Sequence, residues 1–292
     1  MRPFLIPGFA SRASSTIEVM PLAKIETILP VIEGSVHSAD GTRIGYRRLG
    51  DGPALLFVHG SMSTHTDWMR VAKLLAPRYT CYALDRRGRS HSGNGRLPYS
   101  LEREYEDIEA MIAQTGPLAA LIGHSYGAIC TLGAALRNPT AKLVVYEPPL
   151  PVGGLIAGES LEPYARAIAA GDLDTALEIG LTRFMRLPAD IVMVMRASKA
   201  WPRLRTLASG WTRELLAMDT LDPSVDRYAA IACPVLMLVG ALSPEHPMQD
   251  ASRALAQILP DVRVETIPGN GHLAMRDAPE FVAHVIEGFL EG

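Results

Sequence analysis

The sequence predicts an α/β protein built around a mostly parallel β-sheet. Short apolar runs alternate with longer helix-like segments through most of the 292 residues. These runs are apolar at successive positions, which is typical of strands that helices cover on both faces of a sheet. The length suits one large domain with an insertion, and the content of 48% hydrophobic and 20% charged residues is that of an ordinary globular protein.

The sequence predicts the positions of the individual strands and helices. Residues 35–39 and 43–49 predict a hairpin, because a turn at Asp40-Gly41 joins them. Parallel strands are expected at residues 54–58, 79–84, 118–122, 142–146, 234–239 and 262–267. Helices are expected at residues 67–76, 101–115, 128–136 and 249–259 and from residue 279 onward.

Two regions do not follow this alternation. Residues 148–230 are helical stretches rich in Ala, Leu, Met and Arg, interrupted by proline and glycine. We interpret them as a lid over one edge of the sheet, and the alternative is a helical decoration elsewhere. Residues 1–30 are expected to be an N-terminal extension, because their short apolar run is broken by Pro7 and Gly8 and is too short for a secretory signal. The predicted core is then residues 31–147 and 231–292.

Charge and cysteine content limit the partners. The net charge of −3 offers no positive field for nucleic acid or anionic lipid. Three cysteines, an odd number without metal-ligand spacing, indicate buried thiols rather than disulfides. No segment has the uninterrupted apolar length of a membrane span, so a cytoplasmic location is expected.

The pentapeptide Gly123-His124-Ser125-Tyr126-Gly127 is the strongest chemical signal. It joins a predicted strand to a predicted helix, and a serine on such a sharp turn projects its hydroxyl above the sheet edge. Glycines two residues before and after the serine allow the close packing that the turn requires. Ser125 is therefore the candidate nucleophile, and the alternative is an incidental serine in a glycine-rich turn.

A serine hydroxyl needs a base and a group that stabilises the oxyanion. His272 follows a predicted strand in a glycine-rich loop, which makes it the candidate base among the eight histidines. His59-Gly60-Ser61 follows the strand at 54–58, so the backbone N–H groups of Ser61 and Tyr126 are the candidate oxyanion hole. A plain tight turn is the alternative at Ser61. Residues 85–90 are interpreted as scaffold, with Asp85 in an Asx-type turn that rigidifies the neighbouring loop.

The chain resembles the α/β-hydrolase superfamily over residues 35–292. The resemblance rests on His59-Gly60, the turn at residues 85–90, the pentapeptide around Ser125 and Gly271-His272. It implies an eight-stranded, mostly parallel sheet with helices on both faces, a helical cap inserted after the sixth strand, and catalytic residues in the order Ser, acid, His.

The acid departs from the family pattern. Members commonly carry an Asp three residues after a glycine at the end of the seventh strand, where this chain has Ser243. A neutral hydroxyl stabilises imidazolium poorly. The resemblance offers Glu147, at the end of the preceding strand, as in a minority of the superfamily. Glu245 is the alternative acid, a chain without a catalytic acid is another, and Glu147 could instead anchor the cap.

The expected function is a serine hydrolase that cleaves a carboxylic ester, lactone or thioester of a small, largely apolar molecule through an acyl-enzyme on Ser125. This chemistry requires no metal or organic cofactor. Ser125 disfavours the haloalkane dehalogenases and epoxide hydrolases of the superfamily, because those enzymes have Asp at this position. The alternatives are a carbon–carbon bond hydrolase, lyase or cofactor-free perhydrolase on the same triad, or a hydrolase-like ligand-binding receptor. A small-molecule substrate and a monomer or homodimer are expected.

Overall fold

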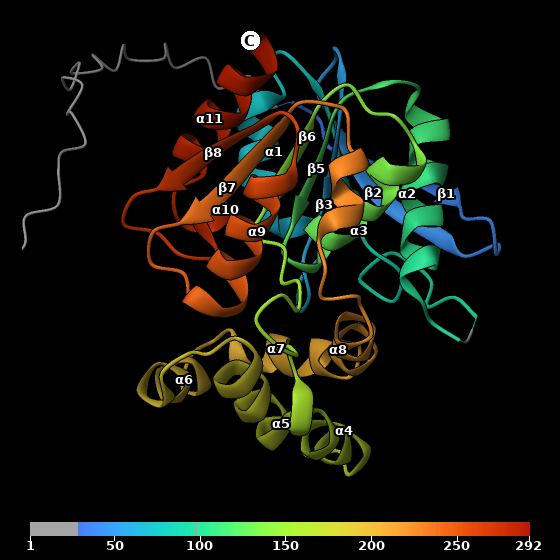
Figure 1. The fold of residues 1–292 in the computed structure, drawn as a ribbon. Helices are drawn as coiled ribbons and strands as arrows, with labels where there is room; N and C mark the ends of the chain where they lie inside the picture. The colour runs from blue at the N-terminus through green and yellow to red at the C-terminus, as the bar shows by residue number, and fades with distance from the viewer. Residues whose placement is uncertain (1–28, 97) are drawn as a thin grey trace, which may run out of the picture.

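The computed structural model describes residues 29–96 and 98–292, so the predicted extension lies almost wholly outside the described chain. Eight strands form one sheet in the order β1-β2-β4-β3-β5-β6-β7-β8 (Figure 1). Strand β2 pairs antiparallel with β1 and β4, and the other neighbours are parallel. The predicted eight-stranded, mostly parallel sheet is confirmed. The strands are β1 (Ile32–His37), β2 (Arg43–Leu49), β3 (Ala54–Val58), β4 (Thr80–Leu84), β5 (Leu118–His124), β6 (Leu143–Tyr146), β7 (Val235–Gly240) and β8 (Val262–Ile267).

Helices cover both faces of the sheet. One face carries α2 (Leu101–Thr115), α3 (Tyr126–Arg137) and α9 (Asp250–Ile258), and the other carries α1 (Met69–Leu75), α10 (Ala274–Asp277) and α11 (Pro279–Glu291). Strand β3 is buried along its whole length, because Leu56 packs into the first of these cores and Leu55 into the second. This double burial explains why its sequence is apolar at every position.

Five α-helices lie between β6 and β7 in the chain, and we call them the inserted helices. They are α4 (Leu161–Ala169), α5 (Leu173–Ile179), α6 (Ala189–Arg196), α7 (Trp201–Ala208) and α8 (Trp211–Asp219). They occupy a separate layer beyond one end of the sheet (Figure 1). Leu177, Val192 and Trp201 form part of a small core of their own, whereas Trp211 joins the main core.

Element boundaries differ from the prediction at two places that matter. Strand β5 continues through His124 and α3 begins at Tyr126, so Ser125 is the sole residue between them. Strand β1 begins at Ile32, ahead of the predicted residue 35, because its outer half is exposed and lacks an apolar pattern. None of the described helices combines the length and apolar character that a bilayer span would need.

Candidate active site

Ser125 occupies a strained turn at the end of β5. Its backbone has φ 54° and ψ −125°, a conformation that residues with a Cβ rarely adopt. The Ser125 N–H donates to Tyr146 O at 2.8 Å, which fixes the turn against β6. The side chain then lies at the start of α3, above the sheet edge and 7% exposed. This conformation is typical of a nucleophile elbow.

Glycines make the turn possible through close packing. A Cβ on Gly123 would lie 2.6 Å from Gly127 O, and a Cβ on Gly127 would lie 2.5 Å from His59 O. A Cβ on Gly60 would lie 2.8 Å from Ser125 Cβ. All three separations are below any normal contact, so the backbone approaches here only because these residues are glycine.

His272 and Glu147 form a buried pair. His272 Nδ1 lies 2.6 Å from Glu147 Oε2, and the carboxyl group is fully buried. An ionised carboxylate only accepts hydrogen bonds, so Nδ1 carries the proton and Nε2 is left with a free lone pair. Gly240 N–H donates to the other oxygen, Oε1, at 2.6 Å. This arrangement orients an imidazole so that Nε2 can accept a proton.

His124 supports the backbone of His272. Its Nε2 lies 2.8 Å from His272 O, and the two rings have centroids 4.4 Å apart. Burial, followed by the neighbouring His272, holds the pKa of His124 well below its usual range. The ring is therefore neutral and donates its Nε2–H to that carbonyl. Tyr146 adds a further link, since its hydroxyl donates to Gly271 O. The sequence prediction assigned no role to His124, although its place beside Ser125 could have drawn attention to it.

The structure also describes the two other positions considered for the acid, Glu245 and Ser243. Glu245 is 77% exposed, and its carboxylate pairs with Arg253 at 3.0 Å instead of with His272. Ser243 is buried, and a Cβ on Gly271 would lie 3.7 Å from its hydroxyl. Of the two glutamates, only Glu147 contacts the candidate base.

In the described chain, the hydrogen bond of the His272 ring is to Glu147, and none joins that ring to the Ser125 hydroxyl. His124 precedes Ser125 in the chain, and its ring centroid lies 4.4 Å from that of His272, with the two planes tilted by 45°. Hydrogen bonds between nucleophile and base are often long in ligand-free enzymes and shorten when substrate binds.

The candidate oxyanion donors lie near Ser125. Ser61 and Ser125 line the same small cavity, of about 20 Å³. Tyr126 is the first residue of α3, where a helix leaves its N–H groups without intrahelical partners. Within residues 29–96 and 98–292, neither the Ser61 N–H nor the Tyr126 N–H donates to a protein acceptor. Both remain available to an oxyanion.

The cavity beside Ser125 is apolar. Apart from Ser61 and Ser125, its walls are Pro149, Ile156, Phe184, Met185, Trp211, Leu215, Met218, Pro247 and Met248. No described charged side chain lines it. Across the described chain, no cluster of three His, Cys, Asp or Glu side chains has the arrangement of a metal site.

The turn at residues 85–90 differs from the prediction. The Asp85 carboxylate accepts from His65 N at 2.9 Å and from the His65 ring, so it links two distant segments instead of closing an Asx turn. Arg86 and Arg87 are each 1% exposed and fully paired. The burial of both arginines depends on acids from other elements.

Comparisons with known proteins agree with this architecture. Residues 55–285 match the family model described as "Alpha/beta hydrolase family". The chain is 27% identical over 257 residues to 2-(acetamidomethylene)succinate hydrolase of Mesorhizobium japonicum, covering 85% of this chain and 91% of that protein. N-formylmaleamate deformylase of Pseudomonas putida is 25% identical over 266 residues, covering 83% of this chain and 90% of that protein.

A solved structure is also similar. An alpha/beta hydrolase from Sphaerobacter thermophilus shares a TM-score of 0.78 and 32% identity, covering 88% of this chain and 99% of that chain. The fold class expected from the sequence and the predicted superfamily are thus confirmed. Because the family model spans most of its length, the chain belongs to the alpha/beta hydrolase family.

Proposed function

We propose that the chain is a serine hydrolase that cleaves a carboxylic ester, lactone or thioester of a small, largely apolar molecule. One observation carries the proposal: the buried hydrogen bond of 2.6 Å between His272 Nδ1 and Glu147, beside the strained turn that presents Ser125. A carboxylate, an imidazole and a serine hydroxyl in this relation support acyl transfer.

Each residue has a distinct role in the proposed reaction. His272 Nε2 takes the proton of Ser125 Oγ as this oxygen attacks the substrate carbonyl carbon, and Glu147 stabilises the imidazolium that forms. The N–H groups of Ser61 and Tyr126 donate to the oxyanion. His272 then gives its proton to the leaving alcohol. Water, deprotonated by His272, attacks the acyl-enzyme and releases the acid and Ser125.

The apolar lining of the cavity favours an apolar acyl group over a charged one. Phe184 and Met185 from the segment after α5, and Trp211 and Met218 from α8, line it together with Ser125. The inserted helices therefore act as a lid in this proposal, with residues 148–230 as the cap. The names of the two curated relatives contain carboxylates, succinate and maleamate, whereas the described lining of this cavity carries no cation. An uncharged substrate fits this lining better.

Cleavage of an N-acyl bond is a second candidate. The relatives' names include an acetamido and an N-formyl group, so both names denote substrates with an acyl group on nitrogen. The same serine, histidine and carboxylate would perform this reaction with an amine as leaving group. Carbon–carbon bond cleavage would also use these residues.

The test is a comparison of wild type with Ser125→Ala on p-nitrophenyl esters of increasing acyl length, with matched p-nitroanilides and a β-diketone alongside. We expect ester turnover, highest for short acyl chains, and a fall of at least about a thousandfold in Ser125→Ala. Anilide or diketone turnover without ester turnover would favour the second candidate or carbon–carbon cleavage. Equal ester turnover by the two proteins would overturn the proposal.

A further inference from the structure

The carbonyl of Gly60 accepts two hydrogen bonds inside the protein. His59 Nδ1 lies 2.8 Å from Gly60 O, and Arg86 Nη1 donates to the same oxygen at 3.2 Å. Arg86 N–H donates to His59 Nε2 at 3.0 Å, so Nδ1 must carry the ring proton. Burial, then the charge of Arg86, lowers the pKa of His59 to about 3. The neutral tautomer that donates to Gly60 is therefore kept at every ordinary pH.

These two bonds set the direction of the Ser61 N–H. The peptide between Gly60 and Ser61 is planar, and in a trans peptide the C=O and N–H point in opposite directions. Holding the carbonyl toward Arg86 thus points the Ser61 N–H in the opposite direction, away from Arg86. Gly60 packs against Ser125, and Ser61 lines the cavity with Ser125, which places this peptide beside the candidate nucleophile.

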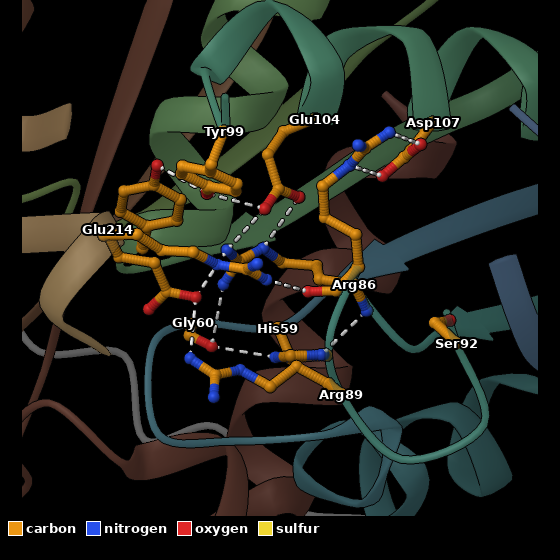
Figure 2. A network of polar contacts seen from close by, with 12 residues as sticks. His59, Gly60, Arg86, Arg89, Ser92, Tyr99, Glu104, Asp107 and Glu214 are labelled. Atoms are coloured by element: carbon orange, nitrogen blue, oxygen red, sulfur yellow. Dashed lines mark hydrogen bonds and ion pairs between the residues drawn. The ribbon is translucent and has the colours of Figure 1, made fainter. Parts of the chain in front are cut away.

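Arg86 is held by acids from two parts of the fold (Figure 2). Glu104, on α2, accepts from Nε at 3.1 Å and from Nη2 at 2.8 Å. Glu214, on α8, accepts from the same Nη2 at 2.8 Å. The Tyr126 ring lies against the guanidinium, with its centroid 4.4 Å away. The position of the donor to Gly60 therefore depends on a residue of the inserted helices.

Glu214 is the link that crosses between the inserted helices and the core. It is fully buried, and one carboxylate oxygen also accepts from Arg89 at 2.7 Å. Two arginines, Arg86 and Arg89, thus meet two carboxylates, Glu104 and Glu214, away from water. Removing one charge from such a group leaves a buried charge uncompensated, which is strongly destabilising unless the remaining partners move.

We propose that Glu214 is a positioning residue that ties the docking of α8 to the orientation of the Ser61 N–H, through Arg86 and the Gly60 carbonyl. This inference rests on the proposed function, in which that N–H binds the oxyanion. When α8 is docked, the oxyanion donor is aligned. When Glu214 is lost, Arg86 keeps only Glu104 as an acidic partner and can shift from the Gly60 carbonyl, which His59 then holds alone.

The test compares Glu214→Gln with Asp107→Asn. Asp107 is a suitable control because it is also buried and forms an ion pair with the adjacent Arg87, at 2.7 Å. Arg87 bonds to Asp40 and Asp107 and not to Gly60. Each protein is measured for kcat and KM on p-nitrophenyl acetate, for the inhibition constant of phenylboronic acid, which forms a tetrahedral adduct with an active serine, and for Tm.

We expect Glu214→Gln to lower kcat by about 10- to 100-fold, with KM changed by less than about threefold, since an oxyanion donor acts mainly in the transition state. Its boronate inhibition constant should rise by a similar factor. Asp107→Asn should lower Tm but leave kcat within about twofold. If Glu214 only anchored the lid, both variants would have a lower Tm, and Glu214→Gln would keep its kcat and its boronate affinity.

A folded Glu214→Gln protein with unchanged kcat and boronate affinity would overturn the inference, as would equal kcat losses in both variants. If Glu214→Gln does not fold, Arg86→Lys serves instead, because it keeps the charge but cannot bond Glu104, Glu214 and Gly60 at once. The same kcat and boronate losses are expected, and their absence overturns the inference. Full activity of Ser125→Ala would identify failure of the proposed function instead.

Discussion

Replacing Glu147 with glutamine tests the assignment of the acid. The glutamine side chain is nearly isosteric with glutamate, and its amide oxygen can still accept the hydrogen bond from Gly240 N–H. The NH₂ group then faces His272 Nδ1, where the carboxylate oxygen lies at 2.6 Å in the wild type. Two donors cannot bond each other, so the imidazole must place its proton on Nε2. That tautomer cannot accept the proton of Ser125.

The size of the effect follows from the lost charge interaction. Opposite charges about 4 Å apart, in a site with an effective dielectric constant of about 20, attract by about 4 kcal/mol. This energy supports the imidazolium only in the transition state, and its loss corresponds to about a thousandfold in rate. The wrong tautomer adds to the loss. We therefore expect kcat of Glu147→Gln to fall by about 10³- to 10⁴-fold.

The assay is hydrolysis of p-nitrophenyl acetate by Glu147→Gln, with Glu245→Gln as the matched control and circular dichroism to establish folding. Glu245 is 77% exposed and pairs with Arg253 on the surface, so its variant should keep kcat within about twofold. A folded Glu147→Gln enzyme that retains more than a tenth of wild-type kcat would refute the reasoning. A larger loss in Glu245→Gln would transfer the role to Glu245.

Three further predictions follow from packing and charge. Gly60→Ala should lower p-nitrophenyl acetate turnover at least about a hundredfold, because its Cβ would lie 2.8 Å from Ser125 Cβ; turnover within tenfold of wild type would contradict this. Burial opposes ionisation of Glu214, but Arg86 and Arg89 outweigh it and lower its pKa from 4.5 to about 2. The stability that ionised Glu214 contributes is complete above about pH 4.5 and is lost as the pH falls toward 2. In urea unfolding, the free energy of unfolding of the wild type should therefore fall by about 2 kcal/mol more between pH 6 and pH 3 than that of Glu214→Gln. Equal losses in the two proteins would argue against the ion pair. Met218→Ala should enlarge the cavity and lengthen the preferred acyl chain by about one or two methylenes, and should lower the free energy of unfolding by about 2–5 kcal/mol. An unchanged chain-length profile would show that this cavity does not bind the acyl chain.

The parallel part of the sheet was predictable because its strands are buried on both faces. The predicted strand at residues 54–58 coincides with β3, and the predicted helix at 101–115 coincides with α2. In both elements, the buried positions are occupied mainly by apolar residues, whose spacing in the sequence predicts the element. Strand β1 is largely exposed, so its first residues carry no such pattern and its start was predicted too late.

The candidate site was partly predictable for a different reason. Ser125, Glu147 and His272 all follow strands, and the carboxyl ends of parallel strands meet at one edge of a sheet. The pairing of Arg86 with Glu214 had no such signal, because the partners are 128 residues apart and meet only through the packing of α8. Likewise, a glutamic acid within a helix predicts a solvated face, and only the fold reveals its burial.

Labelling with a fluorophosphonate, followed by peptide mass mapping, tests the central claim most directly. The claim is that Ser125 is the nucleophile, activated by His272. The account predicts one probe per chain on the peptide that carries Ser125, no labelling of Ser125→Ala, and labelling of His272→Ala slowed by at least about a hundredfold. A wild-type protein that the probe leaves unmodified, or a Ser125→Ala protein labelled as fast as wild type, would contradict it.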